Sequence, residues 1–207
     1  MAKGFVLPCV FVLAAMSATA LAGPLAGDGN AYNDGATTWT GSVLMSSDGL
    51  TVTVDYCVYA PGAFTYAGAG LGGWTPTPGE MVYAYQADSA GSLAVSLLSV
   101  GLLNPAGNIG AVDLGDAGVV PSSSILNGSS ADWHWSPALL SDHSSGLVYC
   151  SIKKPQWWFG SVINGESASG GMLPSPGPDD IPEPATMTLL ALGGLAAAVW
   201  RKKRTGR

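Results

Sequence analysis

The two histidines, His134 and His143, are the residues best suited to acid–base or metal chemistry. Asp142 directly precedes His143, and His134 lies between two tryptophans. A serine triad also needs a nucleophile on a strained turn, and the chain contains no G-x-S-x-G. A zinc site needs three or four ligands at suitable spacing, and H-E-x-x-H is absent as well. We therefore expect surface or turn histidines, no catalytic residues and no enzyme activity.

Oxygen-bearing side chains near the N-terminus are the weaker candidates for a metal. Asp28, Asn30 and Asp34 offer oxygens at roughly alternate positions within a glycine-rich stretch, and calcium favours such ligands. Their spacing does not match an EF-hand loop, and Asp and Asn also form turns without any metal. The sequence predicts no cofactor, with calcium at these three residues as the alternative.

Seven tryptophans are a large number for a chain of 207 residues. Trp133 and Trp135 are two residues apart and share one face of a strand, whereas the adjacent Trp157 and Trp158 point in opposite directions. Core packing is the default for tryptophan, but exposed rings stack on sugars. These four residues are therefore candidate contacts for a carbohydrate.

Cys57 and Cys150 form a candidate disulfide if the chain is exported to an oxidising compartment. Residue alternation places Cys57 on the polar face of its strand and Cys150 on the apolar face of another. Side chains on opposite faces do not pair unless one register slips by a residue. A bridge and two unpaired thiols both stay open.

The elements that would position these residues are short strands. Residues 50–59 alternate strictly, with Val52, Val54, Tyr56 and Val58 on one face, and a Ser-Asp-Gly turn precedes them. Strands are predicted at 37–46, 50–59, 81–87, 93–100, 119–126, 131–135, 146–152 and 157–163. Short strands with turn-rich connections predict an all-β fold, a single antiparallel β-sandwich, with a jelly roll as the alternative.

Composition limits the partners of this domain. Of eight Lys and Arg in the whole chain, only Lys153 and Lys154 lie between the two terminal segments, whereas nearly all fourteen acidic residues lie there. An acidic, cation-poor domain repels phosphate backbones, so we expect no nucleic-acid partner.

The N-terminal segment predicts export. Residues 1–22 contain one early lysine, an apolar stretch and small residues at Ala18, Ala20 and Ala22. This pattern is typical of a secretory signal peptide, with cleavage by signal peptidase after Ala20 or Ala22.

The C-terminal segment predicts a membrane stage. Residues 173–184 are rich in proline and predict an extended stalk. Residues 185–200 are mostly apolar and would span roughly 24 Å as a helix, a short transmembrane segment. Four basic residues follow, favouring a cytoplasmic tail at 201–207: Arg201, Lys202, Lys203 and Arg204.

Pro182-Glu183-Pro184, the short apolar run and the basic end together resemble the PEP-CTERM sorting signal of bacteria. The resemblance implies recognition by an exosortase, transient anchoring in the inner membrane, and release or transfer to the cell surface or extracellular matrix. It also implies a place among proteins that accompany exopolysaccharide and biofilm matrix. Residues 27–30, 38–41 and 161–165 are similar to uncharacterised planctomycete PEP-CTERM proteins, which carry no known activity.

Together these features divide the chain into a signal peptide (1–22), a β-sandwich ectodomain (23–172), a stalk (173–184), a transmembrane helix (185–200) and a basic tail (201–207). The expected function is structural or adhesive, in an exopolysaccharide matrix. The alternative is a lectin-like module that binds exopolysaccharide through exposed tryptophans, with or without calcium.

Overall fold

The computed structural model describes residues 24–66 and 70–178, and these ranges contain strands and no helix. The eleven strands are β1 (Thr40–Ser47), β2 (Leu50–Tyr59), β3 (Gly70–Leu71), β4 (Met81–Ser89), β5 (Val95–Gly101), β6 (Gly107–Val112), β7 (Ser123–Leu126), β8 (Ser130–Leu139), β9 (Gly146–Ser151), β10 (Pro155–Ile163) and β11 (Ala168–Pro176).

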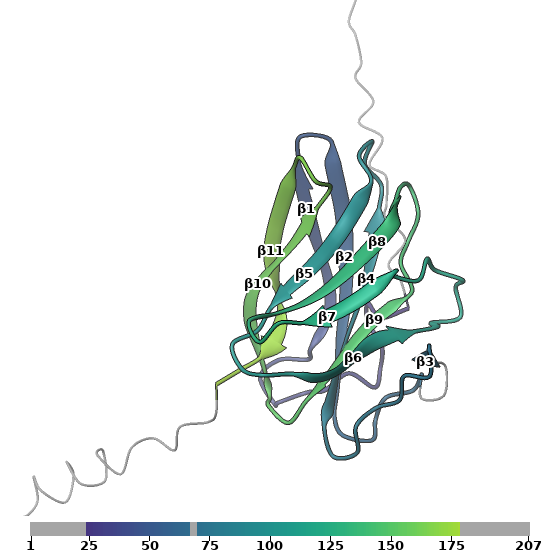
Figure 1. The fold of residues 1–207 in the computed structure, drawn as a ribbon. Coiled ribbons are helices and arrows are strands. Elements are labelled where there is room, and N and C mark those ends of the chain that lie inside the picture. The colour runs from purple at the N-terminus through teal and green to yellow at the C-terminus, as the bar shows by residue number, and fades with distance from the viewer. Residues whose placement is uncertain (1–23, 67–69, 179–207) are drawn as a thin grey trace, which may run out of the picture.

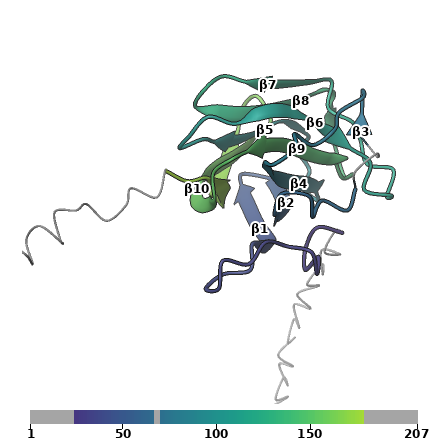
Figure 2. The ribbon, with the colours of Figure 1, turned by 90° about the horizontal axis from the view of Figure 1, so that it is seen from below.

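The strands form two antiparallel sheets that face each other (Figure 1, Figure 2). The first sheet has the order β1-β2-β4-β9-β6-β3, and the second has the order β11-β10-β5-β8-β7. The predicted all-β sandwich is therefore confirmed. The jelly-roll alternative stays a prediction, because the number of strands alone does not decide the topology.

Local sequence explains the best-predicted hairpin. Strands β1 and β2 pair from Ser47 with Leu50 to Thr40 with Cys57, and Asp48 and Gly49 form the two-residue turn. Both turn residues have positive φ, 43° and 88°, which is the conformation that an Asp-Gly hairpin turn requires.

The main core lies between the sheets. It collects the alternating apolar residues Val52, Val54 and Val58 of β2 with Leu98 of β5 and Trp133 of β8, all of them fully buried. Burial of alternate residues on facing strands is what holds the two layers of a sandwich together.

A second apolar cluster lies on the outer face of the first sheet. Tyr59, Val82 and Val148 point away from the main core and are covered by Phe64 and Trp74 of the connection between β2 and β4. The central strands of this sheet are thus buried on both faces, which a prediction of half-buried strands does not anticipate.

The second cluster corrects the prediction for the cysteines. Cys57 and Cys150 both belong to it, so they share a face of the sheet instead of lying on opposite faces. They are nevertheless both free, because β4 lies between their strands: Cys57 pairs with Ala84, and Cys150 with Val82. Two strand spacings are about 9–10 Å, farther than a disulfide spans.

Strand β11 corrects the predicted boundary between domain and stalk. Leu173 and Ser175 are fully buried, and the Tyr85 hydroxyl donates a hydrogen bond to the Pro174 carbonyl. The β-sandwich therefore does not end at residue 172, because residues 173–176 form the last half of an edge strand. The predicted stalk keeps only its later residues, 179–184 of which lie outside the described ranges.

Candidate functional site

The most unusual surface of the described domain is a group of exposed apolar side chains on two neighbouring strands. Trp157, Trp158 and Phe159 of β10 are 38%, 37% and 65% exposed, and Met172 of β11 is 41% exposed. Phe159 and Met172 are direct partners in the antiparallel ladder. We call these four residues the aromatic strip.

One ring of the aromatic strip, that of Trp157, packs against other aromatic residues of the domain. The Trp157 ring packs against Trp39, with centroids 5.0 Å apart, and meets Tyr56 edge-on at 5.6 Å. The indole N–H of Trp39 in turn donates a hydrogen bond of 2.9 Å to the Asp34 carboxylate. These contacts hold Trp157 at a fixed orientation although more than a third of it faces solvent.

Trp158 has a different setting. Its ring contacts Phe159, with centroids 5.6 Å apart in an edge-like arrangement. Gly101 of the neighbouring strand provides the space for it, since a Cβ at that position would lie 2.9 Å from Trp158 Cδ1. A glycine here is needed for close approach and not for backbone conformation.

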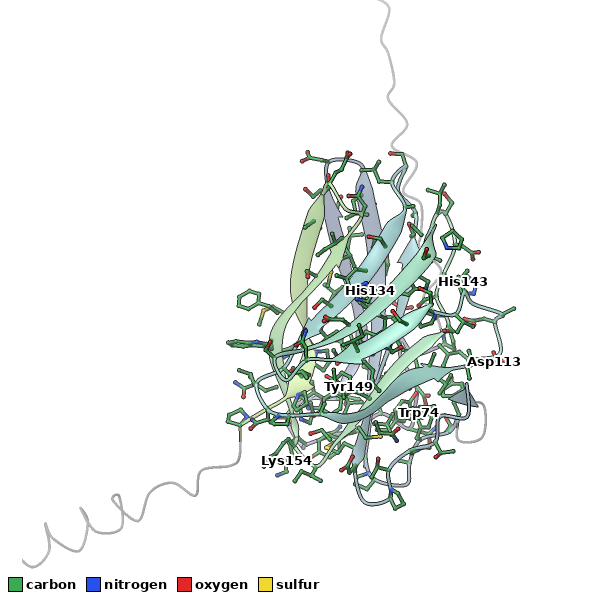
Figure 3. All side chains as sticks on the ribbon, viewed as in Figure 1. Trp74, Asp113, His134, His143, Tyr149 and Lys154 are labelled. Carbon is green, nitrogen blue, oxygen red and sulfur yellow. The ribbon has the colours of Figure 1, made fainter. Side chains whose placement is uncertain are left out.

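The only basic residues of the described ranges, Lys153 and Lys154, precede β10 directly. No acidic residue lies between Asp142 and Glu166 in the sequence. Figure 3 places Lys154 at the corner of the sandwich where β11 ends in Figure 1. The two lysines thus adjoin the aromatic strip along β10, in a domain that is otherwise acidic.

The other predicted tryptophan pair is not on the surface, and its assignment to a sugar site is wrong. Trp133 and Trp135 of β8 are 0% and 4% exposed and belong to the main core. Their indole N–H groups donate hydrogen bonds to the carbonyls of Gly110, at 3.0 Å, and Val119, at 3.3 Å. Neither ring is available to a ligand.

The two histidines lie on different elements (Figure 3). His134 is on β8, and His143 lies in the connection before β9. His143 Nδ1 lies 3.3 Å from Asp142 Oδ1, and His143 Nε2 lies 3.0 Å from the Asp116 carbonyl oxygen. These contacts fix a loop, in agreement with the expected turn histidine.

The carboxylate oxygens of two calcium candidates, Asp28 and Asp34, have partners within the protein. Asp28 accepts hydrogen bonds from Asn30 and from the Tyr59 hydroxyl, and Asp34 accepts them from the backbone of Ala36 and Thr37. The bond from Trp39, followed by these backbone bonds, lowers the pKa of Asp34. Within the described ranges, no group of three or more His, Cys, Asp or Glu could hold a metal ion. Calcium binding stays a prediction.

Both cysteine thiols are buried and protonated at neutral pH. Burial raises the pKa of Cys57 to about 11 and also raises the pKa of Cys150. The backbone N–H of Thr77 donates a hydrogen bond to Cys150 Sγ at 3.4 Å. Because the thiolate is the reactive form, neither cysteine is suited to nucleophilic or redox chemistry.

Sequence reasoning missed half of the aromatic strip. Phe159 and Met172 are single apolar residues, and only the pairing of β10 with β11 brings them together. Glycines and prolines in residues 168–176 interrupt the alternation from which strands are predicted, so β11 was not predicted. Gly171 allows the close approach of the first sheet. A Cβ there would lie 2.7 Å from Val43.

The predicted sorting and processing residues lie outside the described ranges. These are Ala20, Ala22, Pro182, Glu183, Pro184, Arg201, Lys202, Lys203 and Arg204. The predicted transmembrane segment at 185–200 lies there too. Among the residues that the structure describes, none form a helix long and apolar enough to cross a membrane.

Comparison with known proteins adds one finding. No curated protein and no solved structure matches the chain. The family described as "PEP-CTERM protein-sorting motif" matches residues 180–204, beginning four residues after β11 ends at Pro176. This match confirms the PEP-CTERM sorting motif that the sequence predicts at the C-terminal end of the chain.

Proposed function

We propose that this chain is a non-enzymatic protein of the cell surface or extracellular matrix, with a structural or adhesive role among exopolysaccharides. The match of residues 180–204 to the sorting motif carries the proposal. A sandwich whose last strand ends just before that motif is suited to be the part that is delivered.

The proposed route has two processing steps. Signal peptidase would cut after Ala20 or Ala22, and the apolar run at 185–200 would then hold the chain in the inner membrane. The residues Arg201 to Arg204 would stay on the cytoplasmic side. An exosortase-like enzyme would recognise Pro182-Glu183-Pro184 and separate the domain from its tail.

Replacing Pro182, Glu183 and Pro184 together by alanine tests this route in the native host. We expect the variant to accumulate as a larger, membrane-bound form, detected by fractionation and immunoblotting. Pro178→Ala is the matched control, because this proline lies just before the motif and should not affect processing. Unchanged processing and location of the triple variant would contradict the proposal.

A second candidate function is binding of exopolysaccharide through the aromatic strip. It is favoured by the exposure of Trp157 and Trp158, and it no longer includes Trp133 and Trp135. We expect binding to the host's purified exopolysaccharide to be lost in Trp157→Ala and kept in Leu44→Ala, which alters an exposed apolar residue on β1. Absence of binding by the unaltered protein, with and without calcium, would exclude this candidate.

A further inference from the structure

We propose that two hairpin tips of the domain, at Asn127-Gly128 and Asn164-Gly165, are sites of spontaneous modification. Each asparagine is converted to aspartate and isoaspartate without an enzyme, through a cyclic imide formed with the glycine that follows it. Both products carry a negative charge that asparagine lacks. Neither site involves the sorting tail, because both lie between strands of the sandwich.

The two tips have the same structure. They join β7 to β8 and β10 to β11, and in both the asparagine N–H donates a hydrogen bond of 3.1 Å to the carbonyl of the serine three residues later. In both the glycine has a positive φ, 84° for Gly128 and 99° for Gly165, a conformation that favours glycine. The pattern Asn-Gly-x-Ser therefore builds one kind of turn twice.

The backbone nitrogen of each glycine is accessible as a nucleophile. Within the described ranges, the N–H of neither Gly128 nor Gly165 donates a hydrogen bond. Apart from chain neighbours, no heavy atom lies within 4 Å of the position that a Cβ would take at either glycine. Since glycine has no side chain, nothing hinders the approach of its nitrogen to the Cγ atom of the preceding asparagine.

The side-chain carbonyl that this nitrogen attacks is already polarised. Asn164 Oδ1 accepts hydrogen bonds of 2.9 and 2.6 Å from the backbone N–H groups of Glu166 and Ser167. The corresponding bonds to Asn127 Oδ1 measure 3.2 and 2.9 Å. Addition of the nitrogen places negative charge on this oxygen, and preorganised N–H donors stabilise such a charge.

The reaction needs water as its only co-reactant. The glycine nitrogen forms a bond to Cγ and gives its proton to solvent. The Cγ–Nδ2 bond then breaks, and Nδ2 takes up a proton and leaves as ammonia. Water opens the five-membered imide at the side-chain carbonyl to give aspartate, or at the main-chain carbonyl to give isoaspartate. One molecule of water thus replaces one of ammonia, and no electron is transferred.

The two tips differ in the partner of Nδ2. Asn127 Nδ2 donates a hydrogen bond of 2.8 Å to the Asp132 carboxylate. A carboxylate acceptor makes the amide nitrogen richer in electrons and its carbonyl carbon less electrophilic. The longer bonds to Asn127 Oδ1 act in the same direction, so Asn164 should be converted faster than Asn127.

The same carboxylate makes conversion at position 127 more disruptive. A carboxylate there lies beside that of Asp132, and two like charges at this distance repel each other. Strand β7 has four residues and is an edge strand that pairs with β8 alone. Conversion of Asn127 should therefore loosen β7, whereas the backbone donors at Asn164 also bind a carboxylate oxygen.

Peptide mass spectrometry of the exported protein, incubated folded at neutral pH, tests the modification. We expect aspartate and isoaspartate to accumulate at residue 164 several-fold faster than at residue 127. Asn33 is the matched control: its Oδ1 also accepts a backbone N–H, from Gly35 at 2.7 Å, but an aspartate follows it, so it should stay unchanged. The same chain unfolded in urea gives the reference rate. Slower conversion of Asn164 in the folded chain than in urea would mean that the turn protects it, and would overturn the proposal.

Two variants test the consequence of the modification. Asn127→Asp and Asn164→Asp imitate the aspartate products, and circular dichroism checks that both are folded. Hydrogen exchange in β7 should become several-fold faster in Asn127→Asp and stay unchanged in Asn164→Asp. Equal protection of β7 in the two variants would overturn the loosening of this strand.

Discussion

Two tryptophan pairs of the second sheet differ in solvent exposure. Trp133 and Trp135 on β8 are buried and donate their indole N–H groups to backbone carbonyls. Trp157 and Trp158 on β10, two strands away, are each more than a third exposed. Both strands lie next to an edge strand of this sheet, so the contacts of the rings, and not the position of the strands, separate the two pairs.

The comparison shows which tryptophans stabilise the fold and which are available to a partner. The Trp133 ring stacks on Tyr149 with centroids 6.2 Å apart, and Tyr149 stacks on Tyr83 at 5.0 Å. The Trp157 ring is supported by Trp39 and Tyr56 on one side only. The first pair packs within the core, and the second pair is partly exposed, with Trp157 held in place by its contacts with Trp39 and Tyr56.

The largest expected effect is on the buried pair. Trp133→Ala should lower the free energy of unfolding by about 3–5 kcal/mol, because it leaves a cavity in the main core and removes the hydrogen bond to Gly110. Urea unfolding of the exported chain, followed by circular dichroism, measures this change. A loss below about 1 kcal/mol would mean that Trp133 is not the core residue described.

High pH should lower the stability of the fold through Tyr85 and Tyr149, whose rings contact Trp133. Burial raises the pKa of Tyr85 and Tyr149 well above the usual value near 10. Above pH 10 the unfolded chain loses these protons while the folded chain keeps them, so stability falls with rising pH. It should fall by about 1.4 kcal/mol per pH unit for each phenol, in addition to the fall that the buried thiols of Cys57 and Cys150 begin near their unfolded pKa of about 8.5.

Unfolding free energies at successive pH values measure this dependence. The Tyr85→Phe protein should show a shallower fall, since one of the two phenols is gone. A stability that is flat up to pH 11.5 would contradict burial of the two phenols.

The hydroxyl of Tyr85 should contribute a smaller amount at neutral pH. It lies 2.9 Å from the Tyr149 hydroxyl and donates to the Pro174 carbonyl, thereby linking β4, β9 and β11. Tyr85→Phe should cost about 1–3 kcal/mol, because it leaves buried polar groups without this partner. Hydrogen exchange should show the loss most strongly in β11. An even loss across both sheets would argue against a specific link.

The exposed pair should show the smallest effect on stability. We expect Trp157→Ala to cost about 1–1.5 kcal/mol, because it loses the contact with Trp39, and Trp158→Ala to cost less. Both should leave the fold intact while removing glycan contact. If these variants lost as much free energy of unfolding as Trp133→Ala, the proposed difference between the two pairs would be wrong.

Much of the sandwich could be predicted from alternation alone. Residues 50–59 and the Asp-Gly turn gave the correct strand and hairpin, because one face of β2 is apolar throughout. Strands β6 and β11 could not be predicted, since glycine and proline interrupt their patterns and tertiary packing decides them. Alternation places Cys150 on the apolar face of its strand, but residues 146–152 are largely apolar on both faces, so alternation could not tell which face meets the other sheet.

The candidate site was only partly predictable for a related reason. Adjacent tryptophans at 157 and 158 indicated that at least one is exposed, but the sequence could not show that Met172 lies beside Phe159. Trp133 and Trp135 share a face, and their spacing alone does not tell which way that face points. The sorting motif needed no tertiary context, because a processing enzyme reads it as a linear segment.

The intact mass of the protein recovered from the native host's medium or matrix tests the central claim most directly. We predict a mass that lacks residues 1–20 or 1–22 and the tail beyond about residue 184, without the two-dalton loss of a disulfide. A mass that retains residues 185–207 would contradict sorting and release, and would make the protein a membrane-anchored ectodomain.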